Sequence, residues 1–207
     1  MTKENISLEP RAAKLTKSGR VNTPKGRLAF VTLAEPKTKK DAKPGAKPKY
    51  SVAILIPKGA DLSALKALRD AKAKEKWGDK IPPKMRNPIK KAIECVDKDG
   101  NPYTGFDDPR FEYCIWPTAV NKPGVVNGAG VAVTDSAEMY SGRWGLLNVH
   151  AFTYDTDGNR GVSFGLDNVQ LLDHDESLGG RAKASDEFEA VAGVDSGGGD
   201  SDSVFDE

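Results

Sequence analysis

The fold is decided by residues 143–172, which read RWGLLNVHAFTYDTDGNRGVSFGLDNVQLL. Two runs with many aromatic and β-branched side chains flank the segment Asp155-Thr-Asp-Gly-Asn159. The glycine and asparagine of that segment tolerate the positive φ angles of tight hairpin turns. The stretch therefore predicts a long β-hairpin, with strands over 143–154 and 160–172.

Three segments upstream of the hairpin also have strand character. Residues 26–36, GRLAFVTLAEP, alternate between two faces and end at a proline, which cannot donate a sheet hydrogen bond. Residues 50–57, YSVAILIP, are almost entirely apolar, as in a central strand buried on both faces. Residues 111–120, FEYCIWPTAV, are rich in aromatic and β-branched side chains. The chain is thus predicted to contain about five strands.

One main helix is predicted over residues 61–77. Asp61 can cap its N-terminus, Leu62 and Leu65 lie on one side, and Gly78 follows its last turn. Several short strands with a single helix are typical of small antiparallel barrels. We therefore expect a mainly β protein, namely an OB-type Greek-key barrel with one main helix, long loops and a disordered acidic C-terminal tail.

Charge is divided unevenly along the chain. Residues 1–91 hold 24 Lys and Arg against 8 Asp and Glu, a local charge of +16, whereas residues 92–207 carry −15. A basic body with an acidic tail indicates a polyanionic partner for the body. We assign a basic N-terminal arm to 1–24, the barrel domain to 25–185 and the disordered acidic tail to 186–207.

Motifs of catalysis are weak in this sequence. Gly161-Val-Ser163-Phe-Gly165 matches the nucleophile elbow of hydrolases, but strand alternation runs through it, and His174 follows too closely to be a triad partner. The Asp-x-Asp-Gly-Asn segments at 97–101 and 155–159 lack the glycine and glutamate positions of a calcium loop. Two histidines and two cysteines nearly exclude a structural zinc site of the usual type. We expect no catalytic residues, no metal and no cofactor.

Membrane and export signals are not evident. The longest apolar run, 52–56, is far shorter than the roughly 20 residues of a membrane span. The polar first residues do not resemble a signal peptide, and two cysteines without such a signal argue for a reducing compartment. We expect a cytoplasmic protein in which Cys95 and Cys114 are small buried hydrophobes.

One face of the predicted strand 143–154 carries an unusual row of side chains. Leu147, Val149 and Ala151 suit a core, whereas the alternate positions hold aromatic rings with polar residues between them. That alternate face would serve as a platform on which bases stack, each stack contributing roughly 1–3 kcal/mol whatever the base. The alternative is that this face fills the barrel interior. The candidate stacking residues are Trp144, His150, Phe152 and Tyr154, joined by Trp116 from the strand 111–120.

Residues 37–49, KTKKDAKPGAKPK, hold six lysines with two prolines and one glycine. This composition predicts a solvated loop between two strands. Its lysines can neutralise nucleic-acid phosphates, and the alternative is a loop that only keeps the protein soluble. The candidate phosphate contacts are Lys39, Lys40, Lys43, Lys47 and Lys49, together with Arg143 and Arg160 at the start of each long hairpin strand.

The last eight residues, DSDSVFDE, set a Val-Phe pair within a run of acids. Acids can occupy a basic groove, a phenylalanine can replace a stacked base, and the same elements can dock into a basic, apolar pocket of a partner protein. The alternative is a solubilising tail whose phenylalanines are incidental. The candidate partner-binding residues are Asp202, Phe205, Asp206 and Glu207.

Several short segments occur in order between Gly26 and Arg181: GRLAF (26–30), KYSVAILIPK (49–58), KWG (76–78), PGVV (123–126), MYSG (139–142), GNRGVSFGLDNVQ (158–170) and LGGR (178–181). Together they resemble a family of phage single-stranded-DNA-binding proteins. The resemblance implies an OB fold, sequence-independent binding to single strands, and a role in phage DNA replication or recombination in the host cytoplasm. It brings no agreed nucleotide-contacting residues, so the candidates above remain inferences from this sequence.

Two functions from different classes follow. The main one is a non-enzymatic single-stranded-DNA-binding protein that neutralises phosphates and stacks bases on aromatic rings. The alternative is an OB-like scaffold that recruits replication enzymes through its acidic tail, with weak DNA binding. The expected partners are single-stranded DNA and phage or host replication proteins, with no membrane, and a homodimer is left open.

Overall fold

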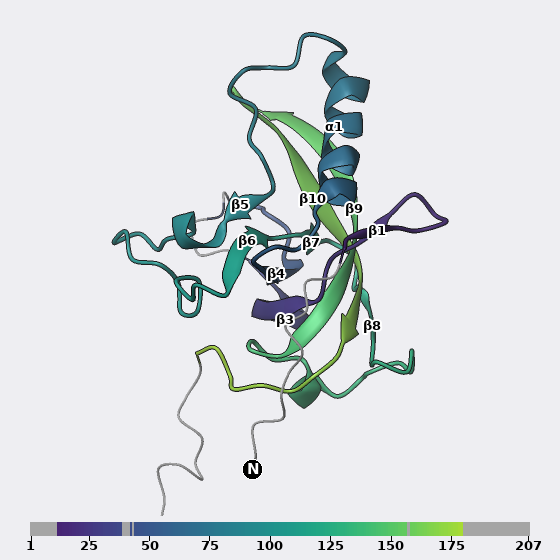
Figure 1. The fold of residues 1–207 in the computed structure, drawn as a ribbon, viewed down its shortest axis with the longest axis vertical. Coiled ribbons are helices and arrows are strands. Elements are labelled where there is room, and N and C mark those ends of the chain that lie inside the picture. Colours follow the sequence, from purple (N-terminus) through teal and green to yellow (C-terminus); the bar gives the residue numbers. More distant parts are fainter. Residues whose placement is uncertain (1–11, 39–41, 43, 157, 180–207) are drawn as a thin grey trace, which may run out of the picture.

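The computed structural model describes residues 12–38, 42, 44–156 and 158–179. Within them the chain forms ten strands, one α-helix and two 3₁₀ helices (Figure 1). In chain order these are β1 (Lys14–Leu15), β2 (Val21–Asn22), β3 (Gly26–Lys37), β4 (Lys49–Pro57), α1 (Ser63–Trp77), β5 (Lys90–Lys91), η1 (Ala92–Glu94), β6 (Phe111–Ile115), β7 (Thr118–Ala119), β8 (Gly124–Val126), η2 (Ser136–Glu138), β9 (Trp144–Thr156) and β10 (Asn159–Leu171). No helix in the described part of the chain is long and apolar enough to cross a membrane.

Five strands close into a barrel. β3 pairs antiparallel with β4, and β4 pairs antiparallel with β7. β7 pairs parallel with β10, β10 pairs antiparallel with β9, and β9 returns to β3 through the register Arg27↔Trp144. The ring order β3–β4–β7–β10–β9 is that of a five-stranded Greek-key barrel. The predicted mainly β fold with an OB-type barrel is therefore confirmed.

The long hairpin has the predicted form. β9 and β10 pair from Thr156↔Asn159 at the turn to Gly145↔Leu171 at the far end. Gly158 has a φ of 78° in the turn, which an L-residue with a side chain rarely adopts. The register shifts between Leu166 and Asn168, so the residue between them is an additional one, a β-bulge.

The predicted strand 111–120 is divided in two. β6 pairs with β4 through Ile54↔Ile115, and β7 pairs with β4 through Ser51↔Thr118. Trp116 and Pro117 lie between the two pieces, where the proline has no N–H to donate. The interruption leaves the Trp116 side chain 38% exposed beside the barrel.

The core lies inside the barrel and under the helix. On β9, Leu147, Val149 and Ala151 are buried, as the alternation predicts. Leu65 and Ala73 of α1 join the same hydrophobic cluster. Figure 1 shows α1 alongside the β9–β10 hairpin. The helix thus covers apolar residues at one side of the barrel.

The helix starts slightly later than predicted. Asp61 accepts a hydrogen bond from the N–H of Ser63 at 2.8 Å, and this bond holds the pKa of the Asp61 carboxyl below its usual value. The helical residues begin at Ser63, since Leu62 has a non-helical backbone. The helix ends at Trp77, and the N–H of Gly78 bonds to the carbonyl of Lys74, as expected of a glycine stop.

Part of the predicted N-terminal arm belongs to the folded sheet. β1 and β2 form a short hairpin, and β2 pairs with β9 through Val21↔Val149. Val21 is fully buried, and the Thr23 hydroxyl accepts a hydrogen bond from the N–H of Leu147 at 3.0 Å. Residues 12–24 therefore extend the barrel domain, while residues 1–11 lie outside the described part of the chain.

Candidate nucleic-acid interface

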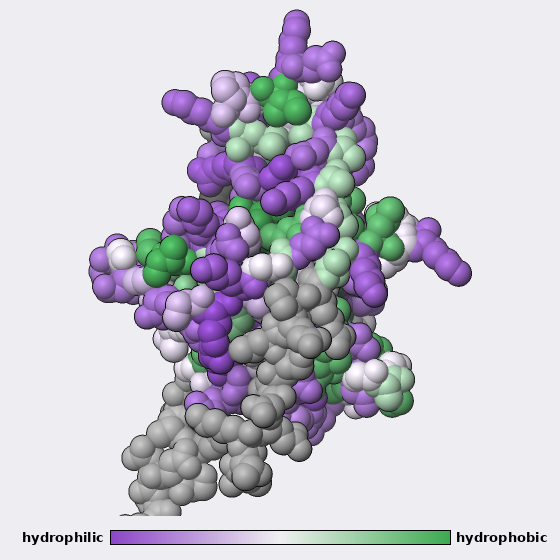
Figure 2. Space-filling model, viewed as in Figure 1, coloured by the Kyte–Doolittle hydropathy of each residue, from purple (hydrophilic) through white to green (hydrophobic). Residues whose placement is uncertain are grey.

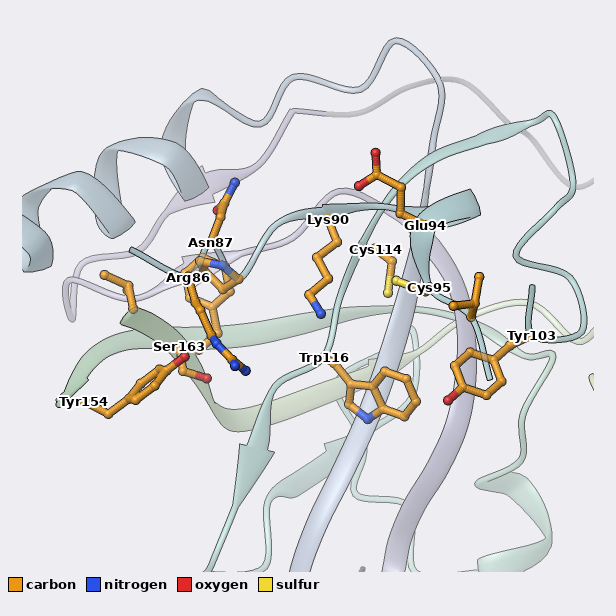
Figure 3. Close-up of a pocket in the computed structure, with 14 residues that line it drawn as sticks. Arg86, Asn87, Lys90, Glu94, Cys95, Tyr103, Cys114, Trp116, Tyr154 and Ser163 are labelled. Atoms are coloured by element: carbon orange, nitrogen blue, oxygen red, sulfur yellow. The ribbon is translucent and has the colours of Figure 1, made fainter. Parts of the chain in front are cut away.

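A groove of about 470 Å³ opens on the outside of the barrel (Figure 3). Its walls come from the segment before β5, from η1, from β6 and from the β9–β10 hairpin. Figure 3 shows the side chains of Arg86 and Lys90 extending into the space between Tyr154 and Trp116. Cations between two aromatic rings are suited to phosphates whose bases stack on those rings.

An aromatic cluster, made of Phe30, Tyr103, Phe106 and Trp116, forms one end of this groove. The rings of Phe30 and Trp116 are stacked, with centroids 4.6 Å apart and an interplanar angle of 25°. Tyr103 meets Phe30 edge-on at 4.9 Å, and the buried Phe106 meets it edge-on at 5.9 Å. Phe30 is 40% exposed, so the stacked pair presents an apolar surface to solvent beside the basic groove.

Phe30 is held in an unusual backbone conformation. Its φ is 49°, the one positive φ among the described residues other than glycine, and left-handed geometry costs about 1–3 kcal/mol. The β3–β4 register shifts between Ala29 and Thr32, and the N–H of Val31 bonds instead to the Ser141 hydroxyl at 3.1 Å. The irregularity turns the Phe30 ring out of the barrel. Simple alternation from the buried Leu28 would place it inside, which is why the sequence pattern missed it.

The cations of the groove are fixed by backbone pairing. The N–H of Arg86 donates to the carbonyl of Arg160 at 2.9 Å, and the N–H of Val162 donates to the carbonyl of Arg86. Lys90 lies opposite Cys114 in the β5–β6 pair. The segment that carries both cations is therefore tied to β10 on one side and to β6 on the other.

The predicted stacking residues of β9 continue the groove. Tyr154 lines it, while Phe152 and His150 line a second depression of about 330 Å³ together with Lys49 and Lys122. Phe152 is 40% exposed, and its centroid lies 6.2 Å from that of His150. The outward face of β9 thus contributes Tyr154 to one depression and Phe152 and His150 to the other.

Small residues on β10 make room for these rings. Gly161 lies opposite Tyr154, Ser163 opposite Phe152, and Gly165 opposite His150. A Cβ at Gly161 would lie 2.6 Å from the Tyr154 hydroxyl, and one at Gly165 would overlap the His150 ring. The Gly-x-Ser-x-Gly motif therefore occupies a strand on which large side chains of β9 rest. This placement agrees with the interpretation of Ser163 as a strand residue.

Two predicted contact residues are corrected by the structure. Trp144 is 1% exposed, and its indole N–H donates to the Asp175 carboxylate at 2.9 Å. Arg143 is 5% exposed and is bound by the Glu138 carboxylate and by the carbonyl of Leu172. Both belong to the interior, so neither is available to stack on a base or to meet a phosphate.

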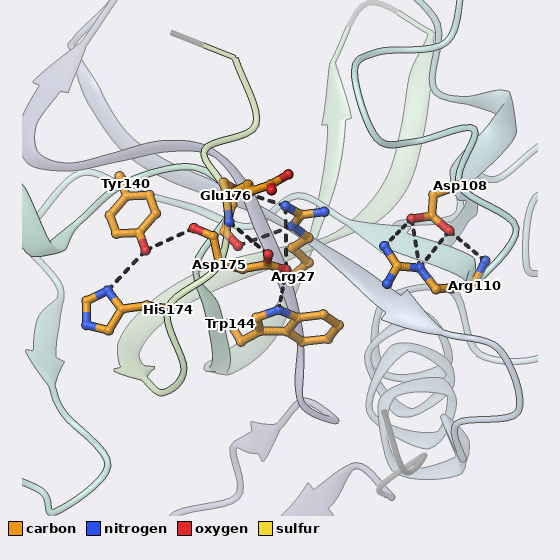
Figure 4. A network of polar contacts seen from close by, with 9 residues as sticks. Arg27, Asp108, Arg110, Tyr140, Trp144, His174, Asp175 and Glu176 are labelled. Atoms are coloured by element: carbon orange, nitrogen blue, oxygen red, sulfur yellow. Dashed lines mark hydrogen bonds and ion pairs between the residues drawn. The ribbon is translucent and has the colours of Figure 1, made fainter. Parts of the chain in front are cut away.

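The physical reason lies in the segment that follows β10. Trp144 points outward from the barrel, as predicted, but residues 173–178 fold back over that end of β9 (Figure 4). Arg27 donates to the carbonyl of Glu176 at 2.9 Å and lies 3.5 Å from the carboxylate of Asp175, while Lys25 pairs with Asp173. Trp144 thereby becomes part of a second small core, made of Ala29, Ala53, Leu55, Ala92, Cys95, Phe106, Phe111, Cys114 and Trp144.

A charged pair lies near this network. Arg110 donates bidentate hydrogen bonds to the two carboxylate oxygens of Asp108 at 2.6 and 3.0 Å (Figure 4). These bonds hold the pKa of the Asp108 carboxyl below its usual value and raise that of Arg110. This cation is already paired, and Arg110 does not line either depression.

The remaining predicted residues divide into two groups. Lys47, Lys49 and Arg160 are exposed, and Arg160 forms an ion pair with Asp155 at 3.1 Å. Of these, Lys49 lines the second depression. The candidates that lie outside the described residues are Lys39, Lys40 and Lys43 of the lysine loop and Asp202, Phe205, Asp206 and Glu207 of the tail.

Most of the surface seen in Figure 2 is hydrophilic, with apolar side chains in small, separated patches. Within the described residues no group of three or more His, Cys, Asp or Glu side chains could hold a metal ion. The groove therefore combines aromatic rings and cations without a metal-binding cluster among the described residues.

Comparisons with known proteins identify a family and two similar folds. Residues 19–198 match a protein family described as "Enterobacter phage Enc34, ssDNA-binding protein". The solved single-stranded DNA-binding protein from bacteriophage Enc34 in complex with ssDNA is 22% identical, with a TM-score of 0.63 over 81% of this chain and 93% of that one. The single-stranded DNA-binding protein gp2.5 of bacteriophage T7 is 14% identical, with a TM-score of 0.51 over 86% of this chain and 100% of that one. No curated protein matches the chain.

Proposed function

Since the chain belongs to the family of the single-stranded-DNA-binding protein of Enterobacter phage Enc34, we propose that it binds single-stranded DNA along the track formed by the two depressions. As a member of such a family the protein is non-enzymatic and acts by binding in phage DNA replication. The observation that carries the proposed path is the exposed stacked pair of Phe30 and Trp116 beside the cations of the groove.

Base stacking supplies affinity without sequence preference. A base laid on the exposed Phe30–Trp116 pair contributes roughly 1–3 kcal/mol, and every base has a π-face to offer. Phe152 and His150 offer further ring surface along the second depression. Because the rings contact base faces, the site accepts any sequence.

Phosphate neutralisation supplies the remaining part of the affinity for single-stranded DNA. Arg86 and Lys90 lie in the first depression, and Lys49 and Lys122 line the second. Each phosphate that meets a cation releases condensed counterions, which makes the affinity fall as salt rises. The strand would run from the aromatic cluster, past Tyr154, to the His150 end of the track.

The acidic tail gives the protein a second partner class. Residues 173–207 carry a local charge of −9, and the last eight include Asp202, Phe205, Asp206 and Glu207. Such a segment competes with DNA for a basic groove and docks on basic, apolar pockets of replication proteins. Strand coating would thus be linked to recruitment of phage or host replication proteins.

The test compares a variant at the stacked pair with a control variant at an exposed apolar residue outside the track. Trp116→Ala removes one ring of the stacked pair, whereas Val131→Ala shortens a side chain that is 60% exposed and lies outside both depressions. Anisotropy of a labelled oligo-dT should show affinity weakened by roughly 1–3 kcal/mol for Trp116→Ala and unchanged for Val131→Ala. Equal affinities for the two variants would contradict the proposed path.

A further inference from the structure

The two cysteines of the chain lie together in the groove. Cys95 and Cys114 both line it, and both are free thiols. Cys95 follows η1, and the β5–β6 register Lys90↔Cys114 folds η1 back onto β6. The two side chains belong to the same small core, and Figure 3 shows them side by side. Both cysteines are buried, as the sequence predicted. Their proximity depends on the β5–β6 contact, which a local sequence pattern does not contain.

The surroundings give the two thiols different acidity. The hydrogen bond from Cys114 lowers the pKa of the Cys95 thiol to about 7, with Lys90 adding to the effect while burial and Glu94 oppose it. The same bond and deep burial raise the pKa of Cys114. Cys95 is therefore the more acidic thiol of the pair and the better attacking group, and Cys114 is its neighbour that can resolve the product.

We propose that Cys95 is an oxidisable thiol in the floor of the groove, that peroxide converts it with Cys114 into an intramolecular disulfide, and that a bound strand shields it. The shielding rests on the proposed function, since only a strand in this groove covers Cys95. The groove gives a small oxidant its route, because Cys95 and Cys114 both face that space.

The chemistry balances with one peroxide. The Cys95 thiolate attacks a peroxide oxygen, the O–O bond breaks, and the departing hydroxide takes up a proton to become water. The Cys114 sulfur then attacks the sulfenic sulfur of Cys95, losing its proton as the S–OH hydroxyl leaves as a second water. The two sulfur atoms together lose two electrons, and one peroxide is reduced to two waters.

The disulfide would act on the aromatic cluster through the backbone. The N–H of Tyr103 donates to the carbonyl of Cys95 at 3.3 Å, so a bond from Cys95 to β6 restrains the segment that carries Tyr103. Tyr103 in turn contacts both rings of the stacked pair. The oxidisable thiol thus lies in the same wall of the groove as the rings proposed to bind the strand.

In the experiment, the full chain is treated with hydrogen peroxide, free thiols are blocked with an alkylating agent, and the mass of the intact protein is measured by mass spectrometry. The wild type should lose the mass of two hydrogens. Cys114→Ser should instead give a sulfenic acid at Cys95 that dimedone traps, and Cys95→Ser should give neither product. With oligo-dT at 100 times its Kd, disulfide formation should slow by about 100-fold, because the free fraction falls in that proportion.

Two results would overturn the inference. One is oxidation of Met85 or Met139 while both thiols remain open to alkylation. The other is an equal rate of disulfide formation with oligo-dT bound, where tryptophan fluorescence confirms that the strand is bound. If the fluorescence shows no binding, the proposed function and the shielding both fail, and the disulfide is judged from the strand-free arm alone.

Discussion

The indole N–H of Trp144 donates a 2.9 Å hydrogen bond to the carboxylate of Asp175, and this bond joins the start of β9 to the segment that leaves β10. Arg27 shares the same carboxylate at 3.5 Å. The end of the barrel that sequence alternation would expose is thus covered by the chain itself. On the hairpin, the proposed DNA track therefore lies at the opposite end, along Tyr154 and Phe152.

Removing this carboxylate should destabilise the fold without changing the track. We expect Asp175→Ala to lower the free energy of unfolding by about 1–3 kcal/mol, because a buried indole N–H loses its acceptor. Urea unfolding measures this loss of stability, and the dependence of the unfolding free energy on urea concentration should be the same in both proteins. Asp70→Ala is the control, since it breaks a surface ion pair with Arg69 and should change stability by less than about 1 kcal/mol. A large loss of oligo-dT affinity with unchanged stability would place Trp144 at the DNA surface instead.

Two substitutions of Phe30 should separate its backbone strain from its role in base stacking. In Phe30→Gly the positive φ costs nothing, whereas Phe30→Ala keeps the strain, so the glycine variant should be more stable than the alanine variant by about 1 kcal/mol. Both variants lose the stacked ring, and both should bind oligo-dT more weakly by roughly 1–3 kcal/mol. Thermal unfolding and anisotropy on the same samples separate the two effects. An alanine variant as stable as the glycine variant would contradict the strain at this position.

Binding should depend strongly on salt. With four or five neutralised phosphates, the slope of log affinity against log salt should be about −3. Arg86→Ala and Lys90→Ala should each reduce the size of that slope by about 0.7, whereas Lys66→Ala, an equal charge change on α1, should leave it unchanged. A salt titration of oligo-dT binding measures all three. Equal salt slopes for the three variants would contradict phosphate contacts by Arg86 and Lys90 in the groove.

The acidic tail should compete with DNA at low salt. Deletion of residues 186–207 removes acids that can occupy the basic groove, so the truncated protein should bind oligo-dT more tightly than the full chain. The difference should shrink as salt screens the tail, since the Debye length falls to about 10 Å at 0.1 M. Unchanged affinity at low salt would exclude competition and leave the partner role to a pull-down with Phe205→Ala.

The sequence predicted the positions of the strands better than it predicted which of their side chains are exposed. Alternation located the long hairpin, the buried face of β9 and the ring residues Phe152 and Tyr154, because these depend on the strand period alone. It failed at Trp144, which a segment thirty residues later covers, and at Phe30, where a bulge shifts the phase of β3. Both failures come from contacts between distant parts of the chain, which a local pattern does not contain.

The pairing of β3 with β9, which closes the barrel, has a consequence for the order in which the chain folds. Its register Arg27↔Trp144 joins residues more than a hundred positions apart, whereas the β3–β4 and β9–β10 pairs join near neighbours. Contacts of such long separation form late, because the entropy of closing the intervening loop must be overcome first. Phe30 and Trp116 leave the ribosome well before Tyr154, so a nascent chain carries one end of the track without the other. We therefore expect the proposed track to be completed only late in folding, when the barrel closes.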